Sequence, residues 1–185
     1  MKIEKTSLDG VFVLEPEFRL TDHRGDTVCA FEEPYGKKLK WQDRQGNTIW
    51  FPDNNPFPSF LKHNFSVSRK NVLRGIHVSD CWKLCYCPFG SLRIVAVDCR
   101  EKKETFGRWQ GFAVNDENRK MILVPPMFGL AHLVLSEQAV FYYHWSDSFD
   151  GEKQKSYRWN SFDITWIYES PGPILSERDA NAPLR

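Results

Sequence analysis

The chain has 185 residues, of which 41% are hydrophobic and 15% aromatic, and its formal net charge is +1 at pH 7. This length and composition suit one compact domain with a buried core and exclude a disordered chain. A net charge near zero argues against binding to nucleic acid or to a membrane through a general positive field. An anionic ligand must therefore be met by locally placed basic residues.

Residues 1–10 are charged and contain no apolar segment of the kind that directs secretion. No apolar run approaches the roughly 20 residues of a membrane-spanning helix. The five cysteines are Cys29, Cys81, Cys85, Cys87 and Cys99. Their odd number, without an export signal, predicts reduced thiols and a cytoplasmic protein. Cys85 and Cys87 do not by themselves predict a metal site, because such a site needs further ligands at workable spacing.

Taken in chain order, the sequence consists of short segments of β-type composition separated by turn residues. Gly10–Pro16 predicts a strand ended by proline, and Arg24–Asp26 predicts a turn before a strand at Thr27–Phe31. A short helix is expected over Pro34–Trp41, and residues 46–58, rich in Asn and Pro, predict a long loop or hairpin.

The later predicted strands are rich in β-branched and aromatic residues. They are Leu61–Val67, Val72–Val78, Lys83–Cys87, Ser91–Asp98, Trp109–Val114, Met121–Val124, His132–Leu135 and Ala139–Trp145. Many short strands with Gly and Pro turns, and no repeat or linker, predict one all-β domain over residues 1–185. We expect a sandwich or barrel with short peripheral helices.

Three polar side chains draw attention because their surroundings are apolar and strand-like. In the segment Arg74–His77, alternation along a strand predicts that Arg74 and Ile76 share one face and that Gly75 and His77 share the other. The unperturbed pKa of histidine lies near neutrality, which suits His77 for proton abstraction. A histidine in a strand is, however, more often structural.

The other two polar side chains are Lys83 and Tyr143. A lysine at a strand start is usually a solvated charge, but Lys83 can also reach into a pocket and stabilise a developing enolate oxygen. Alternation places Tyr143 on one face with Phe141 and Trp145, and Tyr142 on the other. Tyr143 is a candidate general acid, and aromatic packing is the alternative reading.

Several other chemistries have no pattern in this chain. The sequence contains no Ser, His and Asp in the order of a catalytic triad, no phosphate-binding glycine loop and no pair of catalytic carboxylates. The His-x-His metal pattern of cupin barrels is also missing around His77. Composition and spacing alone therefore predict a β domain with a candidate pocket.

The segments Asn64–Ser68 and Asn71–His77 resemble the dTDP-4-dehydrorhamnose 3,5-epimerase family. Further matches, in the family's order, are Lys83–Leu84, Val95–Arg100, Thr105–Trp109, Val124–Pro126, Leu135–Glu137, Ala139–Tyr143, Trp159–Asn160 and Leu175–Asp179. The resemblance extends from Arg24–Gly25 to the C-terminal tail. Its most specific part is the run around His77 together with the late Leu-Ser-x-x-Asp.

The resemblance implies a cupin-type jelly roll, usually a homodimer whose N-terminal strands cross to the partner, with no metal and no redox cofactor. It implies an isomerase whose partner is a nucleotide-sugar substrate, with no nucleic acid and no membrane involved. The C4 ketone of a 4-keto-6-deoxy sugar acidifies the hydrogens at C3 and C5. A base can remove one of them, and an acid can return a proton to the opposite face. Such inversion belongs to deoxysugar synthesis for surface polysaccharides such as capsule or O-antigen.

By the same resemblance, four residues are catalytic. His77 is the base, and Asp179 orients its ring and stabilises the imidazolium. Lys83 stabilises the enolate oxygen, and Tyr143 supplies the proton across the sugar.

Further residues are expected to bind the substrate. Arg74 would meet the diphosphate through charge-assisted hydrogen bonds. Lys62, Asn64 and Arg24 would complete the pocket, with Arg24 reaching it from the partner chain. Asp98 is expected to order the pocket wall rather than to react.

The chain also departs from the rhamnose-pathway pattern. The stretch 78–82 is shorter than usual, Cys29 stands where those enzymes carry a glutamate, and Lys62 replaces a glutamine. The usual Gly-Phe-Ala-His-Gly-Phe has become Met127–His132, which moves the histidine by two positions. An even shift keeps the same face of a strand, so His132 is a further expected substrate contact.

Two of these features, the short stretch between His77 and Lys83 and the run Pro-Pro-x-x-Gly-x-x-His at residues 125–132, resemble relatives that act on GDP-linked 6-deoxy-4-keto-heptoses. The nucleotide (dTDP, GDP or CDP), the sugar, and whether C3, C5 or both are inverted therefore stay open. Two other functions share parts of the pattern. One is a nucleotide 4-keto sugar 3,4-ketoisomerase, which uses the same enol intermediate, and the other is a non-catalytic sugar-binding cupin.

Overall fold

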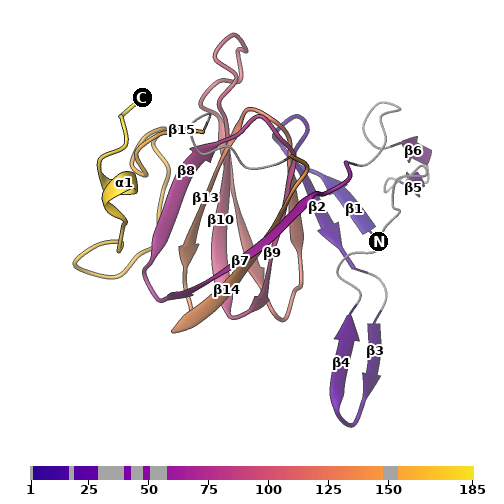
Figure 1. The fold of residues 1–185 in the computed structure, drawn as a ribbon. Coiled ribbons are helices and arrows are strands. Elements are labelled where there is room, and N and C mark those ends of the chain that lie inside the picture. Colours follow the sequence, from indigo (N-terminus) through magenta and orange to yellow (C-terminus); the bar gives the residue numbers. More distant parts are fainter. Residues whose placement is uncertain (1, 17–18, 29–39, 43–47, 51–57, 148–153) are drawn as a thin grey trace.

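The structure, a computed structural model, describes residues 2–16, 19–28, 40–42, 48–50, 58–147 and 154–185. Within these residues two antiparallel sheets face each other and enclose the core (Figure 1). The prediction of an all-β fold is confirmed. No helix in the described part of the chain is long and apolar enough to cross a membrane.

The larger sheet has six strands. Their order is β1 (Lys2–Lys5), β2 (Phe12–Glu15), β12 (Met121–Val124), β9 (Lys83–Phe89), β14 (Gln138–Trp145) and β7 (Lys62–Arg69). The smaller sheet has five, in the order β11 (Trp109–Asn115), β10 (Ser91–Asp98), β13 (Phe128–Val134), β8 (Leu73–Val78) and β15 (Lys155–Ser156).

Two hairpins lie outside these sheets. β3 (Arg19–Asp22) pairs with β4 (Gly25–Val28), and this hairpin projects away from the barrel (Figure 1). β5 (Lys40–Gln42) pairs with β6 (Thr48–Trp50).

Apolar residues at alternate positions of the facing strands build the core. Cys85 and Cys87 of β9 point inward and meet Ile94 and Ala96 of β10, and all four are buried. Leu84, the residue before Cys85 on β9, points to the opposite face and joins a second apolar cluster. Inward and outward residues thus follow the period of two expected for strands buried on both faces.

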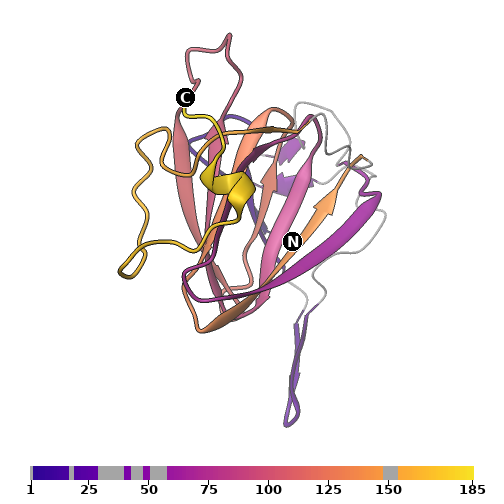
Figure 2. The ribbon, with the colours of Figure 1, turned by 60° about the vertical axis from the view of Figure 1, so that its left-hand side comes forward.

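The C-terminal segment covers the outer face of the smaller sheet (Figure 2). Phe162 and Ile164 of this segment pack on Ile76 and Val78 of β8. Backbone hydrogen bonds tie Tyr157 to Ile76, at 3.0 and 3.1 Å. The segment ends in the helix α1 (Glu177–Ala180), which therefore lies beside β8 although the two are far apart in sequence.

Most predicted strands are present within a few residues, and the differences have physical reasons. The predicted strand His132–Leu135 begins earlier, at Phe128, because Gly129 is a point of close packing under Ile76 and not a turn. The expected helix over Pro34–Trp41 is wrong at its end, where Lys40–Gln42 pairs as a strand. Residues 34–39, and the end of the predicted strand Thr27–Phe31, lie outside the described part. Neither β1 nor α1 was predicted.

Candidate active site

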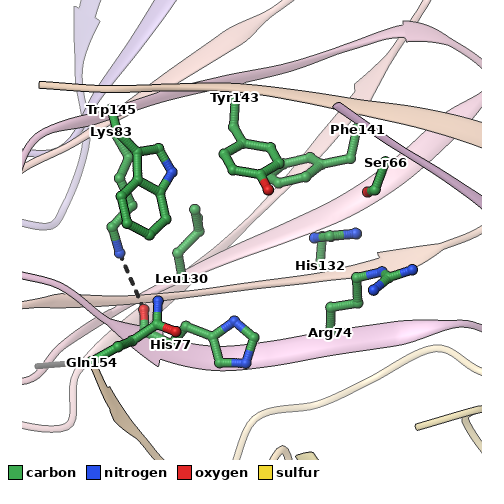
Figure 3. A pocket seen from close by; sticks show the side chains of 10 residues that line it. All are labelled: Ser66, Arg74, His77, Lys83, Leu130, His132, Phe141, Tyr143, Trp145 and Gln154. Atoms are coloured by element: carbon green, nitrogen blue, oxygen red, sulfur yellow. Dashed lines mark hydrogen bonds between the residues drawn. The ribbon is translucent and has the colours of Figure 1, made fainter. Parts of the chain in front are cut away.

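A cavity of about 200 Å³ opens between β7 and β14 of the larger sheet and β8 and β13 of the smaller one (Figure 3). Its walls are formed by Ser66, Arg74, His77, Lys83, Leu130, His132, Phe141, Tyr143, Trp145 and Gln154. Pockets that bury a drug-sized ligand usually measure about 300–1,000 Å³. This cavity lies below that range, so a larger ligand would extend out of it.

The prediction that Arg74 and His77 lie on opposite faces of their strand is wrong. Both side chains line the cavity, and both project from β8 in Figure 3. Ile76 points the other way, into the apolar layer under the C-terminal segment.

A β-bulge in β8 explains this departure from simple alternation. His77 pairs with Leu130 and Arg74 pairs with His132, so β8 has one residue more than β13 between the two pairs. An extra residue re-aims the side chains that follow it. Gly75 lies in this bulge with a φ of +117°, and a Cβ there would come within 2.6 Å of β13. Glycine at position 75 thus permits two polar side chains three residues apart to enter one cavity.

His77 and Asp179 form a hydrogen-bonded pair. The His77 Nε2 lies 2.7 Å from the Asp179 Oδ1, and the Asp179 Oδ2 accepts the N–H of Gly75 at 3.2 Å. Asp179 is held in place by its own N–H, which donates to the Oγ of Ser176, the N-cap of α1. Burial alone would raise the pKa of Asp179, but the hydrogen bonds and charge of His77 and the Gly75 N–H lower it overall.

An ionised Asp179 fixes the tautomer of His77. Since Nε2–H donates to the carboxylate, the lone pair lies on Nδ1. One ring nitrogen of His77 faces the interior of the cavity, toward Tyr143 (Figure 3). His77 is therefore arranged to accept a proton there.

Lys83 is buried at the end of the cavity, and only 1% of its surface is exposed. Its Nζ donates to the carbonyl oxygens of His77 at 3.1 Å and Phe128 at 3.5 Å. Burial lowers the pKa of Lys83 from 10.5 to about 8. An ammonium in such a site acts strongly on a nearby developing negative charge.

Tyr143 lies on the wall opposite His77, and its phenol oxygen points into the cavity (Figure 3). Phe141 and Trp145 share its face, which confirms the predicted alternation of β14. Burial raises the pKa of the Tyr143 phenol, so the group keeps its proton at neutral pH. A base on one wall and a proton donor on the other thus face the same space.

The expected substrate-binding residues occupy three different places. Arg74 and His132 line the cavity. Asn64 and Lys62 pair with Tyr143 and Trp145 across the β7–β14 ladder, beside the cavity wall. Arg24 lies on the projecting hairpin, where its guanidinium pairs with Asp22 at 2.5 Å, and it does not line the cavity of its own chain. Cys29 lies outside the described residues.

Asp98 occupies a structural position, as expected. Its buried carboxylate accepts hydrogen bonds from the Arg100 guanidinium, at 2.7 and 3.0 Å, and from the Thr105 hydroxyl at 2.6 Å. The guanidinium of Arg100 in turn lies 4.8 Å from the ring centroid of Phe128, whose carbonyl is an acceptor for Lys83. Asp98 therefore supports the wall next to Lys83 without entering the cavity.

Sequence reasoning assigned no role to Ser66, Leu130 or Gln154. Ser66 could have been found by alternation from Asn64 along β7. No local sequence pattern could have identified Gln154, because contacts with residues distant in sequence hold it in the cavity wall. Its side-chain amide donates to the Ser79 hydroxyl at 3.3 Å and accepts from the Arg178 guanidinium at 2.9 Å. Within the described ranges, no group of three His, Cys, Asp or Glu side chains is arranged to hold a metal ion.

The family model described as dTDP-4-dehydrorhamnose 3,5-epimerase matches residues 5–185 of this chain. The dTDP-4-dehydrorhamnose 3,5-epimerase of Salmonella typhimurium is 33% identical over 190 residues, which cover 100% of this chain and 95% of that protein.

Two solved structures are similar over nearly their whole length. The dTDP-4-dehydrorhamnose 3,5-epimerase of Elizabethkingia anophelis superposes with a TM-score of 0.81 at 33% identity, covering 100% of this chain and 96% of that one. A dTDP-6-deoxy-D-glucose-3,5-epimerase of Legionella pneumophila, in complex with dTDP-4-keto-L-rhamnose, gives a TM-score of 0.83 at 28% identity, covering 99% and 92%. The predicted cupin-type jelly roll is thereby confirmed.

Proposed function

Because the chain belongs to the dTDP-4-dehydrorhamnose 3,5-epimerase family, we propose that it inverts C3, C5 or both of a nucleotide-linked 4-keto-6-deoxy sugar. The observation that carries this proposal is one cavity with the hydrogen-bonded His77–Asp179 pair on one wall, Tyr143 on the other and the Lys83 ammonium at one end. The chain is an isomerase that makes a deoxysugar nucleotide.

The reaction transfers protons and changes no oxidation state. The Nδ1 of His77 takes the proton from the carbon beside the ketone, and the electron pair of the C–H bond forms an enolate. Asp179 stabilises the imidazolium, and the Lys83 ammonium stabilises the enolate oxygen. Tyr143 then gives its proton to the opposite face of the same carbon. To complete the cycle, His77 releases its proton to solvent and Tyr143 recovers one from solvent. Inversion results because donor and acceptor lie on opposite walls.

The rest of the substrate extends out of the cavity past Arg74, which is exposed enough to bind the diphosphate. His132 contacts the sugar, and Asn64 and Lys62 border its exit. The described cysteines are all free and buried, in keeping with the reducing cytoplasm in which we place the enzyme.

Exchange of solvent deuterium tests the proposed chemistry. The enzyme is incubated in D2O with dTDP-, GDP- and CDP-linked 4-keto-6-deoxy sugars, and NMR follows C3 and C5. We expect deuterium at one or both carbons with one of these substrates, and none with His77→Asn. A 3-keto product would identify a ketoisomerase instead. Binding without exchange would identify a sugar-binding protein.

We also propose a homodimer in which Arg24 serves the partner's cavity. Phe65 is 65% exposed and Val67 49% exposed on the outer face of β7, which forms one edge of the larger sheet. Such apolar residues on a sheet edge are suited to contact with a second chain.

Mixing two inactive variants tests this arrangement. If Arg24→Ala and His77→Asn chains exchange freely, half of the dimers are hybrids with one intact site, so about a quarter of wild-type activity returns. No recovery after exchange would count against shared sites.

A further inference from the structure

His132 is a buried polar side chain in the cavity wall that has no part in the proton transfers. Only 4% of its surface is exposed, and its ring stacks on Phe141 with centroids 4.0 Å apart. Its Nε2 has no hydrogen-bond partner among the described residues. Buried polar groups are usually paired, and an unpaired one lowers stability. An unpaired nitrogen on a residue that lines a cavity points to a ligand that completes its hydrogen bonding.

The imidazole of His132 is neutral at every working pH. Burial lowers its pKa to about 3, and the nearby charges of Arg74 and His77 act in the same direction. A neutral imidazole offers one donor and one acceptor. A sugar hydroxyl can either donate to or accept from the unpaired Nε2, whichever tautomer is present, whereas a phosphate would be better met by the adjacent Arg74.

The strand register fixes where His132 lies relative to the reacting groups. Arg74 and His132 are paired on β8 and β13, and His77 and Leu130 form the next pair toward Lys83. The Lys83 Nζ lies beyond this pair, 3.1 Å from the carbonyl oxygen of His77. From one end of the cavity to the other, the order is therefore Arg74 with His132, then His77, then Lys83 (Figure 3).

The substrate carries its groups in the same order. The diphosphate is on C1, the acidic hydrogen is on C3 and the ketone is at C4. With Arg74 at the diphosphate, His77 at C3 and Lys83 at the ketone oxygen, C2 lies next to His132. We propose that His132 binds the C2 hydroxyl and makes the enzyme selective for the presence and configuration of that group. This inference rests on the proposed epimerase function and adds a specificity-determining residue to it.

A comparison of two substrates with two enzymes isolates this contact. Wild type and His132→Phe are assayed for deuterium exchange at C3 with the 4-keto-6-deoxy sugar nucleotide and with its 2-deoxy analogue. Phenylalanine keeps the stacking on Phe141 and removes both ring nitrogens. The preference of wild type for the 2-hydroxy substrate, measured as the ratio of the two kcat/KM values, should fall by at least about 10-fold in the variant.

Leu130→Met is the matched control, because Leu130 is on the same face of β13 two residues away. This variant should change kcat/KM for both substrates by the same factor. His132→Gln, which keeps a neutral donor and acceptor, should restore part of the preference. Thermal unfolding separates the alternatives, since His132→Phe should not lower Tm if the imidazole serves the ligand.

An unchanged preference in His132→Phe, or a lowered Tm with equal losses on both substrates, would overturn the assignment. Either result would leave the epimerase proposal standing, because wild type would still exchange C3. Absence of exchange by wild type on every substrate would instead refute the proposed function itself.

Discussion

Replacement of Lys83 by methionine should stabilise the protein and nearly abolish its activity. The folded state keeps an ammonium that is only 1% exposed, and burial lowers its pKa from 10.5 to about 8. At about 1.4 kcal/mol per tenfold change in proton affinity, the charged form is disfavoured by about 3 kcal/mol. The hydrogen bonds to the carbonyls of His77 and Phe128 offset part of this, at about 1 kcal/mol each or less.

Lys83→Met should therefore raise the free energy of unfolding at pH 7 by about 1–2 kcal/mol. For a chain of this size this corresponds to a Tm higher by about 3–6 °C. The gain should shrink as the pH rises from about 8 to 10.5, the two ends of the pKa range of Lys83. In that window the unfolded wild type binds more protons than the folded one, so wild-type stability increases with pH.

The same variant should lose a factor of about 10²–10³ in kcat, because nothing else described in the cavity supplies a cation to the enolate oxygen at that end. In wild type, kcat/KM should decline above pH ~8 as the free enzyme loses the Lys83 proton.

Chemical denaturation between pH 7 and 10.5 measures the stability effect, and deuterium exchange measures the activity. Lys155→Met is the control, since Lys155 is an exposed partner of Glu101 and its loss should change stability by less than about 0.5 kcal/mol. A Lys83→Met protein that is less stable than wild type at pH 7, or whose advantage does not depend on pH, would refute this reasoning.

Three further substitutions test the remaining parts of the site. Asp179→Asn should lower kcat by about 10³–10⁴, because an amide facing His77 favours the wrong tautomer of its ring. The double variant with His77→Asn should lose little more kcat than either single variant. Additive losses would show that His77 and Asp179 do not act as one unit. Tyr143→Phe should keep much of the deuterium exchange but lose inversion measured by NMR, and equal losses would contradict a role limited to reprotonation. Gly75→Ala should lower Tm and activity together, since its Cβ would come within 2.6 Å of β13 at a φ of +117°; an unchanged Tm would show that the bulge tolerates a side chain.

Strand positions could be predicted because local composition and turn residues largely determine them. Ser91–Asp98 and Met121–Val124 were predicted with the bounds that the structure has. The shared face of Phe141, Tyr143 and Trp145 followed from a period of two. These features depend on residues close in sequence.

The interior of the site was less predictable from local patterns. The bulge at Gly75 depends on how β8 pairs with β13, which no local pattern reveals, and it moved Arg74 to the face of His77. Lys83 stands at the start of a strand, where a lysine is usually solvated, and only the packing of the surrounding strands makes it buried. The pairing of Asp179 with His77 was expected from family resemblance alone, because 102 positions separate them.

That separation has a consequence for how the enzyme comes into being. The sheets are complete once Ser156 has paired with His77, whereas Asp179 arrives only with the final turn of the C-terminal segment. The C-terminal residues of a chain are the last to be synthesised. A chain that has been synthesised only as far as Ser156 therefore contains every strand of the two sheets and still lacks the His77–Asp179 pair that we propose as the catalytic base.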